Sequence, residues 1–205
     1  MELLTQDETE ALCRDLARVR DEAPVVKAYA QLVAQVDREV ERLTELHRRH
    51  LQCGPGCDAC CHVERTVNTL EAYWIWRALE ANRPSLPEPQ ADRCALLVDS
   101  LCAVYPARPI LCRTHGLPLL VFDRGELGVT YCELNFQHLD AQGFEASEVL
   151  EMGPINAELL RLDQAFSQQV LRRSWNPRRR VALAELVRVY NRLPRADGST
   201  DPEAR

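Results

Sequence analysis

The sequence has 205 residues, of which 46% are hydrophobic and 27% charged, and its net charge is −6. This length and composition suit one globular domain, or one domain with an appended helical arm. They exclude a small disulfide scaffold, because nine cysteines in a chain of this length fall below the cysteine density of such proteins.

The N-terminal segment is charged and shows no apolar h-region of a signal peptide. No run approaches the ~18 consecutive apolar residues that a membrane-spanning helix needs. We therefore expect a cytoplasmic protein with no membrane partner. In the cytoplasm thiols stay reduced, and clustered cysteines bind metals more often than they form disulfides.

The charge is unevenly distributed along the chain. From Arg161 to Arg195 there are nine arginines against Asp163 and Glu185, a local balance of +7 that leaves −13 for the remainder. A basic end of this kind could bind nucleic acid or an acidic partner. Because Lys27 is the only lysine, the simpler interpretation is a solvated helix face in an arginine-rich sequence. We expect no nucleic acid partner, and an unknown protein or redox partner stays open.

Residues 1–50 predict an N-terminal helical arm. A first helix is expected from about Gln6 to Arg20, and a longer amphipathic helix from Pro24 to His50, where apolar residues recur at three- and four-residue steps. Proline is favoured at the first helical position. Cys13 lies at the edge of the first apolar stripe, and we interpret it as a small buried hydrophobic side chain.

Residues 51–140 are predicted to form a loop-rich, cysteine-cluster metal-binding region. Asn68, with Glu71 three residues later, is typical of a capping box that begins a helix over 68–82. Prolines predict irregular structure from Cys94 to His115. The segments LPLLVF and LGVTY then predict one small β-hairpin.

The last part of the chain predicts C-terminal helices within 141–193. They are expected over 155–173 and over 177–193, and the tail 194–205 is expected to be disordered. The predicted fold is therefore mainly α: a helical domain around a loop-rich cysteine and metal centre, with one small β-hairpin.

Eight cysteines lie between positions 53 and 132 and are the candidate metal ligands. A tetrahedral zinc ion and a cubane iron–sulfur cluster each take four protein ligands, and thiolates suit both. Eight thiols could therefore hold two centres, or one centre with spare thiols. Adjacent side chains point in different directions, so two neighbouring cysteines are not expected to bind one small ion together. The eight are Cys53, Cys57, Cys60, Cys61, Cys94, Cys102, Cys112 and Cys132.

Three other interpretations of these cysteines find less support. A disulfide network conflicts with the cytoplasmic context and the odd number of cysteines. A thioredoxin-like site needs its C-x-x-C after a strand, whereas Cys57–Cys60 follows a long helix and a Gly-Pro-Gly turn. The spacing of Cys53, Cys57 and Cys60 resembles that of radical S-adenosylmethionine enzymes, but Ala59 replaces the usual aromatic residue and no series of β/α units follows.

Three segments together resemble a known family. CGPGCDACCHVERTVNTLEA, CALLVDSLCAVYPARPILCRTHGLPL and CELNF are similar to the bacterial cysteine-cluster family called YkgJ-like, a zinc- or iron-chelating domain, over about positions 50 to 140. Pro106 stands where that family commonly has an acidic residue. The resemblance implies metal binding with no general reaction assigned. Flagellin lysine methylases carry a related cluster, but their additional sequence is not evident here.

Charged residues beside the motif are candidates for an outer shell around the metal. Arg108 and Arg113 flank Cys112 and could offset thiolate charge or donate hydrogen bonds to sulfur. The alternative is that Arg108 caps a nearby carbonyl or pairs with an acid. His62 and His115 could serve as ligands, although eight thiols favour an outer-shell role for them.

The sequence therefore predicts a metal-binding cysteine-cluster protein that holds one or two centres. The excess of closely set cysteines favours an iron–sulfur cluster, [4Fe–4S] in type, with a structural or electron-transfer role. One alternative is a zinc-binding structural or interaction protein. Another is a cluster-dependent redox or S-adenosylmethionine-using enzyme that acts on a protein.

Overall fold

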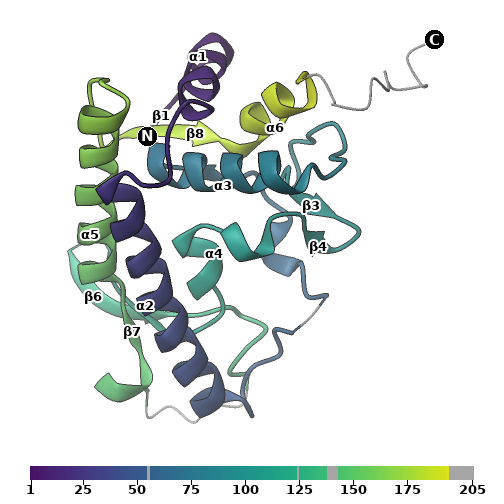
Figure 1. The fold of residues 1–205 in the computed structure, drawn as a ribbon. Helices are drawn as coiled ribbons and strands as arrows, with labels where there is room; N and C mark the ends of the chain where they lie inside the picture. Colours follow the sequence, from purple (N-terminus) through teal and green to yellow (C-terminus); the bar gives the residue numbers. More distant parts are fainter. Residues whose placement is uncertain (55, 124, 138–142, 194–205) are drawn as a thin grey trace.

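The computed structural model describes residues 1–54, 56–123, 125–137 and 143–193 (Figure 1). About half of the chain is helical, and the strands are short. The helices are α1 (Gln6–Leu16), α2 (Pro24–His47), α3 (Thr69–Asn82), α4 (Ile110–Thr114), α5 (Met152–Ala165) and α6 (Leu183–Asn191). The fold is thus helix-rich with small sheets, in agreement with the coarse prediction.

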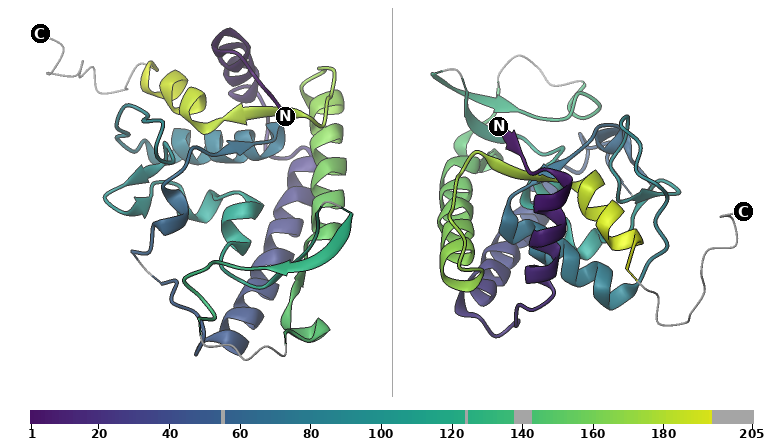
Figure 2. Two further views of the ribbon diagram at one scale, coloured as in Figure 1. Left: turned by 180° about the vertical axis from the view of Figure 1, so that it is seen from behind. Right: turned by 90° about the horizontal axis from the view of Figure 1, so that it is seen from above.

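Helix α3 lies at the centre of the molecule. In Figures 1 and 2, α1, β8 (Arg179–Ala182) and α6 lie on one side of α3, and α4 lies on the other. Strand β8 pairs in parallel with β1 (Glu2–Leu3) and antiparallel with β2 (Thr66–Val67). This small sheet joins the start of the chain, the segment after the cysteine loop, and the C-terminal part.

Helices α2 and α5 pack side by side; in Figure 1, α5 stands at the left of the molecule and α2 runs downward from the level of α3. Against them lies a three-stranded sheet in the order β6-β5-β7. The antiparallel pair β5 (Leu119–Asp123) and β6 (Glu126–Thr130) is the predicted hairpin, which is confirmed, and β7 (Leu150–Glu151) runs parallel to β5.

Two of the helix starts follow the chemistry expected of their sequences. Pro24 is the first residue of α2, and Asn68 caps α3 by accepting a hydrogen bond from the Glu71 N–H at 2.8 Å. The reciprocal half of the predicted capping box is absent from α3, because the Glu71 carboxylate instead accepts from the Ile110 N–H at 3.0 Å. Glu71 therefore connects α3 to the start of α4.

The core contains the large aromatic side chains of α2 and α3. Tyr29, Tyr73 and Trp76 are almost completely buried, as is Phe166, whose ring centroid lies 5.2 Å from that of Tyr73. Cys13 is 2% exposed within α1, which confirms its interpretation as a buried hydrophobic residue.

The prediction of one helix over 177–193 is wrong in its first part. Residues 179–182 form β8, and α6 begins only at Leu183. The backbone of this segment finds partners on both sides, in β1 and β2, and its last two residues are buried. Strand pairing from distant parts of the chain therefore overrides the helical tendency.

Other boundaries and segments also differ from expectation. Helix α1 ends at Leu16, and α5 is followed by one π-helical turn, Phe166–Val170. The segment expected to be irregular contains short regular pieces that bring its three cysteines to fixed positions. They are the hairpin β3 (Leu97–Val98) and β4 (Leu101–Cys102), the 3-10 turn Tyr105–Ala107, and α4.

The expected disordered tail, 194–205, lies outside the described residues. The division of the chain at 50, 140 and 193 stays a prediction. None of the helices in the described part is long and apolar enough to cross a bilayer.

Candidate metal centre

The cysteines come from three segments of the chain. Four lie in the loop between α2 and β2, three lie between Cys94 and the end of α4, and Cys132 follows β6. Figure 1 shows β3, β4 and α4 on the side of α3 that faces away from β8. All nine cysteines lie among the described residues, and each is a free thiol.

Five thiols gather around the contact between the first two segments, and we call them the five-thiol group. The Cys94 N–H donates to the Cys61 carbonyl at 2.7 Å, which joins the two segments directly. The Cys94 carbonyl in turn accepts from the Leu97 N–H, and Leu97 is paired with Cys102 across the β3–β4 hairpin. The group consists of Cys60, Cys61, Cys94, Cys102 and Cys112.

The thiols of this group act on one another electrostatically. The Cys61 thiol donates to the sulfur of Cys60, which lowers the pKa of Cys60 to about 6 and raises that of Cys61. Burial raises the pKa of Cys112 to about 12, and the neighbouring Cys94 thiol adds to the shift. A positive ion would lower the pKa of all these thiols, since metal binding requires the thiolate forms.

The other three thiols form a separate set, the three-thiol group: Cys53, Cys57 and Cys132. Burial raises the pKa of Cys53, and Cys57 and Cys132 raise it further, while a hydrogen bond from Asn135 lowers it. Cys53 and Cys57 are exposed, whereas Cys94 in the five-thiol group is buried. The other five, Cys60, Cys61, Cys102, Cys112 and Cys132, are partly exposed.

Asn135 connects two members of the three-thiol group, Cys53 and Cys132. Its Oδ1 accepts from the N–H groups of Gln52 at 2.7 Å and Cys53 at 3.3 Å. Its Nδ2 donates to the Gly116 carbonyl at 2.8 Å and to the Cys53 sulfur at 3.5 Å. Its own N–H donates to the Cys132 carbonyl at 2.9 Å. One side chain that is 1% exposed thus joins three segments.

Gly116 permits this close approach. Its φ is +100°, and a Cβ at this position would lie 3.2 Å from both the Cys53 sulfur and the Asn135 Nδ2. A side chain would therefore add backbone strain and press on the sulfur. Sequence reasoning overlooked both Gly116 and Asn135, although both belong to the segments that carry the family resemblance.

Arg65 is the arginine that acts on several thiols of the five-thiol group. Its guanidinium donates to the Cys60 carbonyl, and its charge lowers the pKa of Cys60, Cys94 and Cys112. In a sequence with many arginines, nothing local distinguishes Arg65. Only the fold shows its role, because the chain between the cysteine loop and β2 places the Arg65 guanidinium near these sulfurs.

The two arginines predicted from the sequence occupy different places. Arg108 lies over the Tyr105 ring, 4.0 Å from its centroid, and its charge lowers the pKa of Cys102. Arg113 is buried, and one guanidinium nitrogen lies 2.8 Å from both carboxylate oxygens of Asp37. Arg113 thus attaches α4 to α2, and its described hydrogen bonds go to oxygens.

The two candidate histidines are also separated. The charge of His115 lowers the pKa of Cys60, which places this ring within electrostatic reach of the five-thiol group. His62 Nε2 lies 3.3 Å from the Asp58 carboxylate, and its side chain is about half exposed. His115 is therefore the better placed of the two to act on the sulfurs.

The donor set fits a soft metal in kind and number, because thiolates are the ligands that zinc and iron–sulfur clusters prefer. The described residues nevertheless contain no group of three Cys, His, Asp or Glu side chains positioned to hold one ion. The fold brings the thiols into two neighbourhoods without setting them in a coordination geometry. Metal binding would have to draw the loops inward, and the ligand roles of the eight cysteines stay a prediction.

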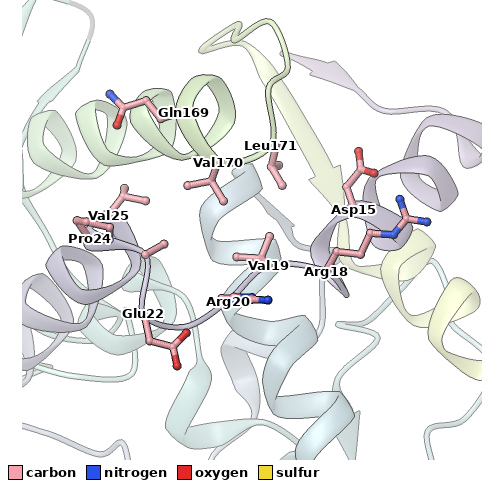
Figure 3. Close-up of a pocket in the computed structure, with 11 residues that line it drawn as sticks. Asp15, Arg18, Val19, Arg20, Glu22, Pro24, Val25, Gln169, Val170 and Leu171 are labelled. Atoms are coloured by element: carbon pink, nitrogen blue, oxygen red, sulfur yellow. The ribbon is translucent and has the colours of Figure 1, made fainter.

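A hollow of about 730 Å³ lies elsewhere, between the α1–α2 connection and the π-helical turn after α5 (Figure 3). Val19, Val25 and Val170 give it apolar walls, and Arg18 and Glu22 add charge. It is lined by none of the eight candidate cysteines. This hollow is therefore separate from the thiol chemistry, and it supplies no substrate cavity beside the sulfurs.

Comparison with known proteins finds a similarity for most of the cysteine-bearing part of the chain. Residues 52–128 match the family described as "CxxCxxCC: Putative zinc- or iron-chelating domain". The match includes seven of the eight candidate cysteines and ends before Cys132. No curated protein and no solved structure matches the chain.

Proposed function

Because residues 52–128 match the CxxCxxCC family of zinc- or iron-chelating domains, we propose that the chain holds an iron–sulfur cluster at its five-thiol group. The family match and the gathered cysteines support metal binding as such. We further propose that the metal is an iron–sulfur cluster and not zinc, and that its role is structural or in electron transfer.

The observation that carries this proposal is the direct contact between two cysteine-bearing segments. The backbone bond between Cys94 and Cys61 brings thiols from the loop, the β3–β4 hairpin and α4 into one neighbourhood. This supplies the four thiolates that a cubane cluster takes from the protein, with one thiol to spare. Four of the five would serve as thiolate ligands, and the cluster would supply one-electron chemistry or a structural cross-link.

Positive charge near the sulfurs supports a thiolate-bound metal centre. Four thiolates and a cluster leave a negative centre, which is costly in a partly buried site unless cations offset it. Arg65 and His115 both lower the pKa of Cys60, so they favour the anionic form of the sulfur that a metal needs. Arg65 would also fix the direction of the loop through its bond to the Cys60 carbonyl.

Zinc binding in a structural role is the second candidate. The segment between α3 and α4 has only a two-residue-per-strand hairpin and one 3-10 turn as regular structure. Segments with so little secondary structure are commonly stabilised by a metal. A cluster-dependent enzyme receives no comparable support, since the hollow in Figure 3 is not lined by the candidate cysteines.

Single substitutions test the proposed centre. Cys112→Ser and Cys60→Ser should each lower the iron and sulfide content of anaerobically purified protein, because serine is a poor ligand for soft metals. Metal analysis and the visible spectrum measure this loss. Cys13→Ala, a change within α1, should keep the full content. Unchanged loading in both serine variants would show that these thiols are not ligands.

A further inference from the structure

The hairpin of β5 and β6 has an outer edge with which no other strand of the described residues pairs. We propose that this edge is the interface through which two copies of the chain associate, with β6 of each copy paired antiparallel to β6 of the other. The inference goes beyond the proposed function, because no part of it depends on a bound metal.

Strand β6 is the end strand of its sheet and is open to solvent. The sheet has the order β6-β5-β7, and Figure 1 shows β6 at the periphery of the molecule. All five residues of the strand are exposed. Every second residue of an end strand directs its N–H and C=O away from the sheet, so these groups are available to a further strand.

The sequence of β6 lacks the features that usually protect such an edge. Proteins commonly place lysine, proline or a bulge on their end strands, or cover them. Strand β6 contains no lysine or proline, and its only charged residue is Glu126. It also pairs with β5 without a bulge over all five residues. An unprotected end strand of this kind is typical of an edge to which another strand is added.

The apolar side chains of β6 point away from the core of their own chain. Leu119 of β5 is buried in the core, and its cross-strand partner is Thr130. Because side chains alternate along a strand, Thr130 and Gly128 share the face that Leu119 turns to the core. Leu127 and Val129 therefore lie on the outer face, where they are 66% and 38% exposed. Packing within the chain does not account for these two apolar residues.

A second copy of β6 fits this edge because the strand is complementary to itself. When a two-fold axis passes beside Gly128, all five residues of one strand pair with those of the other. Leu127 then lies opposite Val129 of the second copy, and each gains an apolar neighbour on its open side. Glu126 lies opposite Thr130 of the second copy, so no like charges meet.

Gly128 is the residue at the centre of this arrangement. A Cβ at Gly128 would meet nothing within 4 Å in its own chain, so the packing of the single chain does not require a glycine there. A glycine inside a strand often marks a place where another backbone approaches closely. A register shifted by one residue would instead set the apolar face of one strand beside the polar face of the other.

Sedimentation velocity of the full chain at increasing protein concentration tests the association. Anaerobically purified protein would be kept reduced throughout, because all nine cysteines are free thiols and disulfide-linked dimers must be excluded. We expect monomer and dimer in reversible equilibrium below about 1 mM protein. No larger species should form, since a two-fold interface closes after two copies. Protein that stays monomeric up to that concentration, or that forms open-ended assemblies, would overturn the proposal.

Two double variants of β6 test whether this strand is the interface. Leu127→Lys combined with Val129→Lys places like charges opposite each other across the axis and should abolish the dimer. Leu127→Lys combined with Val129→Glu removes the same two apolar side chains but places opposite charges there, so part of the association should return. An equal dimer content in the two double variants would show that β6 does not pair in this register.

Substitution of Thr130 tests the register while every apolar side chain is kept. Thr130→Lys places a positive charge opposite Glu126 of the second copy, and Thr130→Glu places a negative charge there. We expect the first to strengthen dimerisation and the second to weaken it, each by about threefold to thirtyfold, because the pair occurs twice. Ala17→Lys and Ala17→Glu make the same charge changes at the end of α1 and should leave dimerisation unchanged. Equal dimerisation of the two Thr130 variants would contradict the register.

Metal content separates this inference from the proposed function. None of the changed residues is a candidate ligand, so the iron and sulfide content should be the same in monomeric and dimeric variants. A monomeric wild-type protein with its full metal content would overturn the interface alone, and a dimer without bound metal would overturn the proposed function alone.

Discussion

At the scale of single residues, the site depends on side chains whose roles only tertiary contacts reveal. Asn135 and Gly116 lie far from the cysteine loop in sequence, yet they contact Cys53 and each other. Arg65 approaches the five-thiol group from the segment that leads into β2. The spacing of the cysteines indicates the candidate metal ligands. Asn135, Gly116 and Arg65 instead fix the loops that carry these cysteines, through contacts between segments.

Gly116→Ala should destabilise the protein by about 1–3 kcal/mol, because alanine at φ +100° is strained and its Cβ would press on the Cys53 sulfur. Urea denaturation measures the change in the free energy of unfolding. Gly128→Ala in β6 is the matched control, since a Cβ there meets nothing within 4 Å. Equal stability of the two variants would show that the close approach at Gly116 has no energetic consequence.

At the scale of elements, α4 is too short to hold its position alone and is attached to both neighbouring helices. Glu71 of α3 accepts from its first N–H, and Arg113 within it binds Asp37 of α2. Cys112 lies between these two attachment points. The position of this thiol therefore depends on two buried polar contacts and on the helices that supply them.

Glu71→Ala should cost about 1–3 kcal/mol in unfolding free energy, because it leaves the buried Ile110 N–H without an acceptor. Glu71→Gln keeps an amide oxygen for that N–H and should cost less. Urea denaturation of the two variants side by side measures the difference. An equal loss of unfolding free energy in both variants would show that the hydrogen bond from the Ile110 N–H does not contribute to stability.

The buried carboxyl group of Glu71 should also make the unfolding free energy depend on pH. Burial raises the pKa of Glu71 above its ordinary value of 4.5, so the folded state holds the proton more tightly than the unfolded chain does. The stability of the wild-type protein relative to Glu71→Gln should therefore be greatest below that value and fall as pH rises through the raised pKa. Unfolding free energies of both proteins, measured at pH values below and above 4.5, provide the test. A wild-type protein that gains stability relative to Glu71→Gln as pH rises would contradict the expectation.

The elements also show what sequence patterns can and cannot predict. The starts of α2 and α3 and the β5–β6 hairpin were predictable, because Pro24, Asn68 and the alternating strands act locally. Strand β8 was not, since its partners lie at the other end of the chain and beside the cysteine loop. Likewise, the spacing of the cysteines indicated metal binding but not their division into two groups.

At the scale of the whole molecule, three of the C-terminal arginines pair with acidic residues of the N-terminal helix α1. Arg173 binds Asp15 at 2.5 Å, Arg192 binds Glu10 at 2.6 Å, and Arg179 pairs with Glu8. The opposite charges of the two ends of the chain thus meet in the fold. The local excess of positive charge in the sequence is therefore partly neutralised where α1 lies beside β8 and α6 (Figure 2).

We accordingly expect no binding of DNA or RNA even at low salt, where electrostatic attraction to phosphates is strongest. Fluorescence anisotropy with labelled single- and double-stranded oligonucleotides at low ionic strength measures this. Binding that weakens steeply with added salt would show that enough arginines remain available for a phosphate backbone.

The central claim is that the gathered thiols hold an iron–sulfur cluster. Its most direct test is the iron, zinc and acid-labile sulfide content of anaerobically purified wild-type protein, with the visible spectrum of the same sample. The proposal predicts about four irons per chain, matching sulfide, and broad absorption near ~400 nm. A colourless, sulfide-free protein with zinc alone would contradict the cluster, and a protein without bound metal would contradict the centre itself.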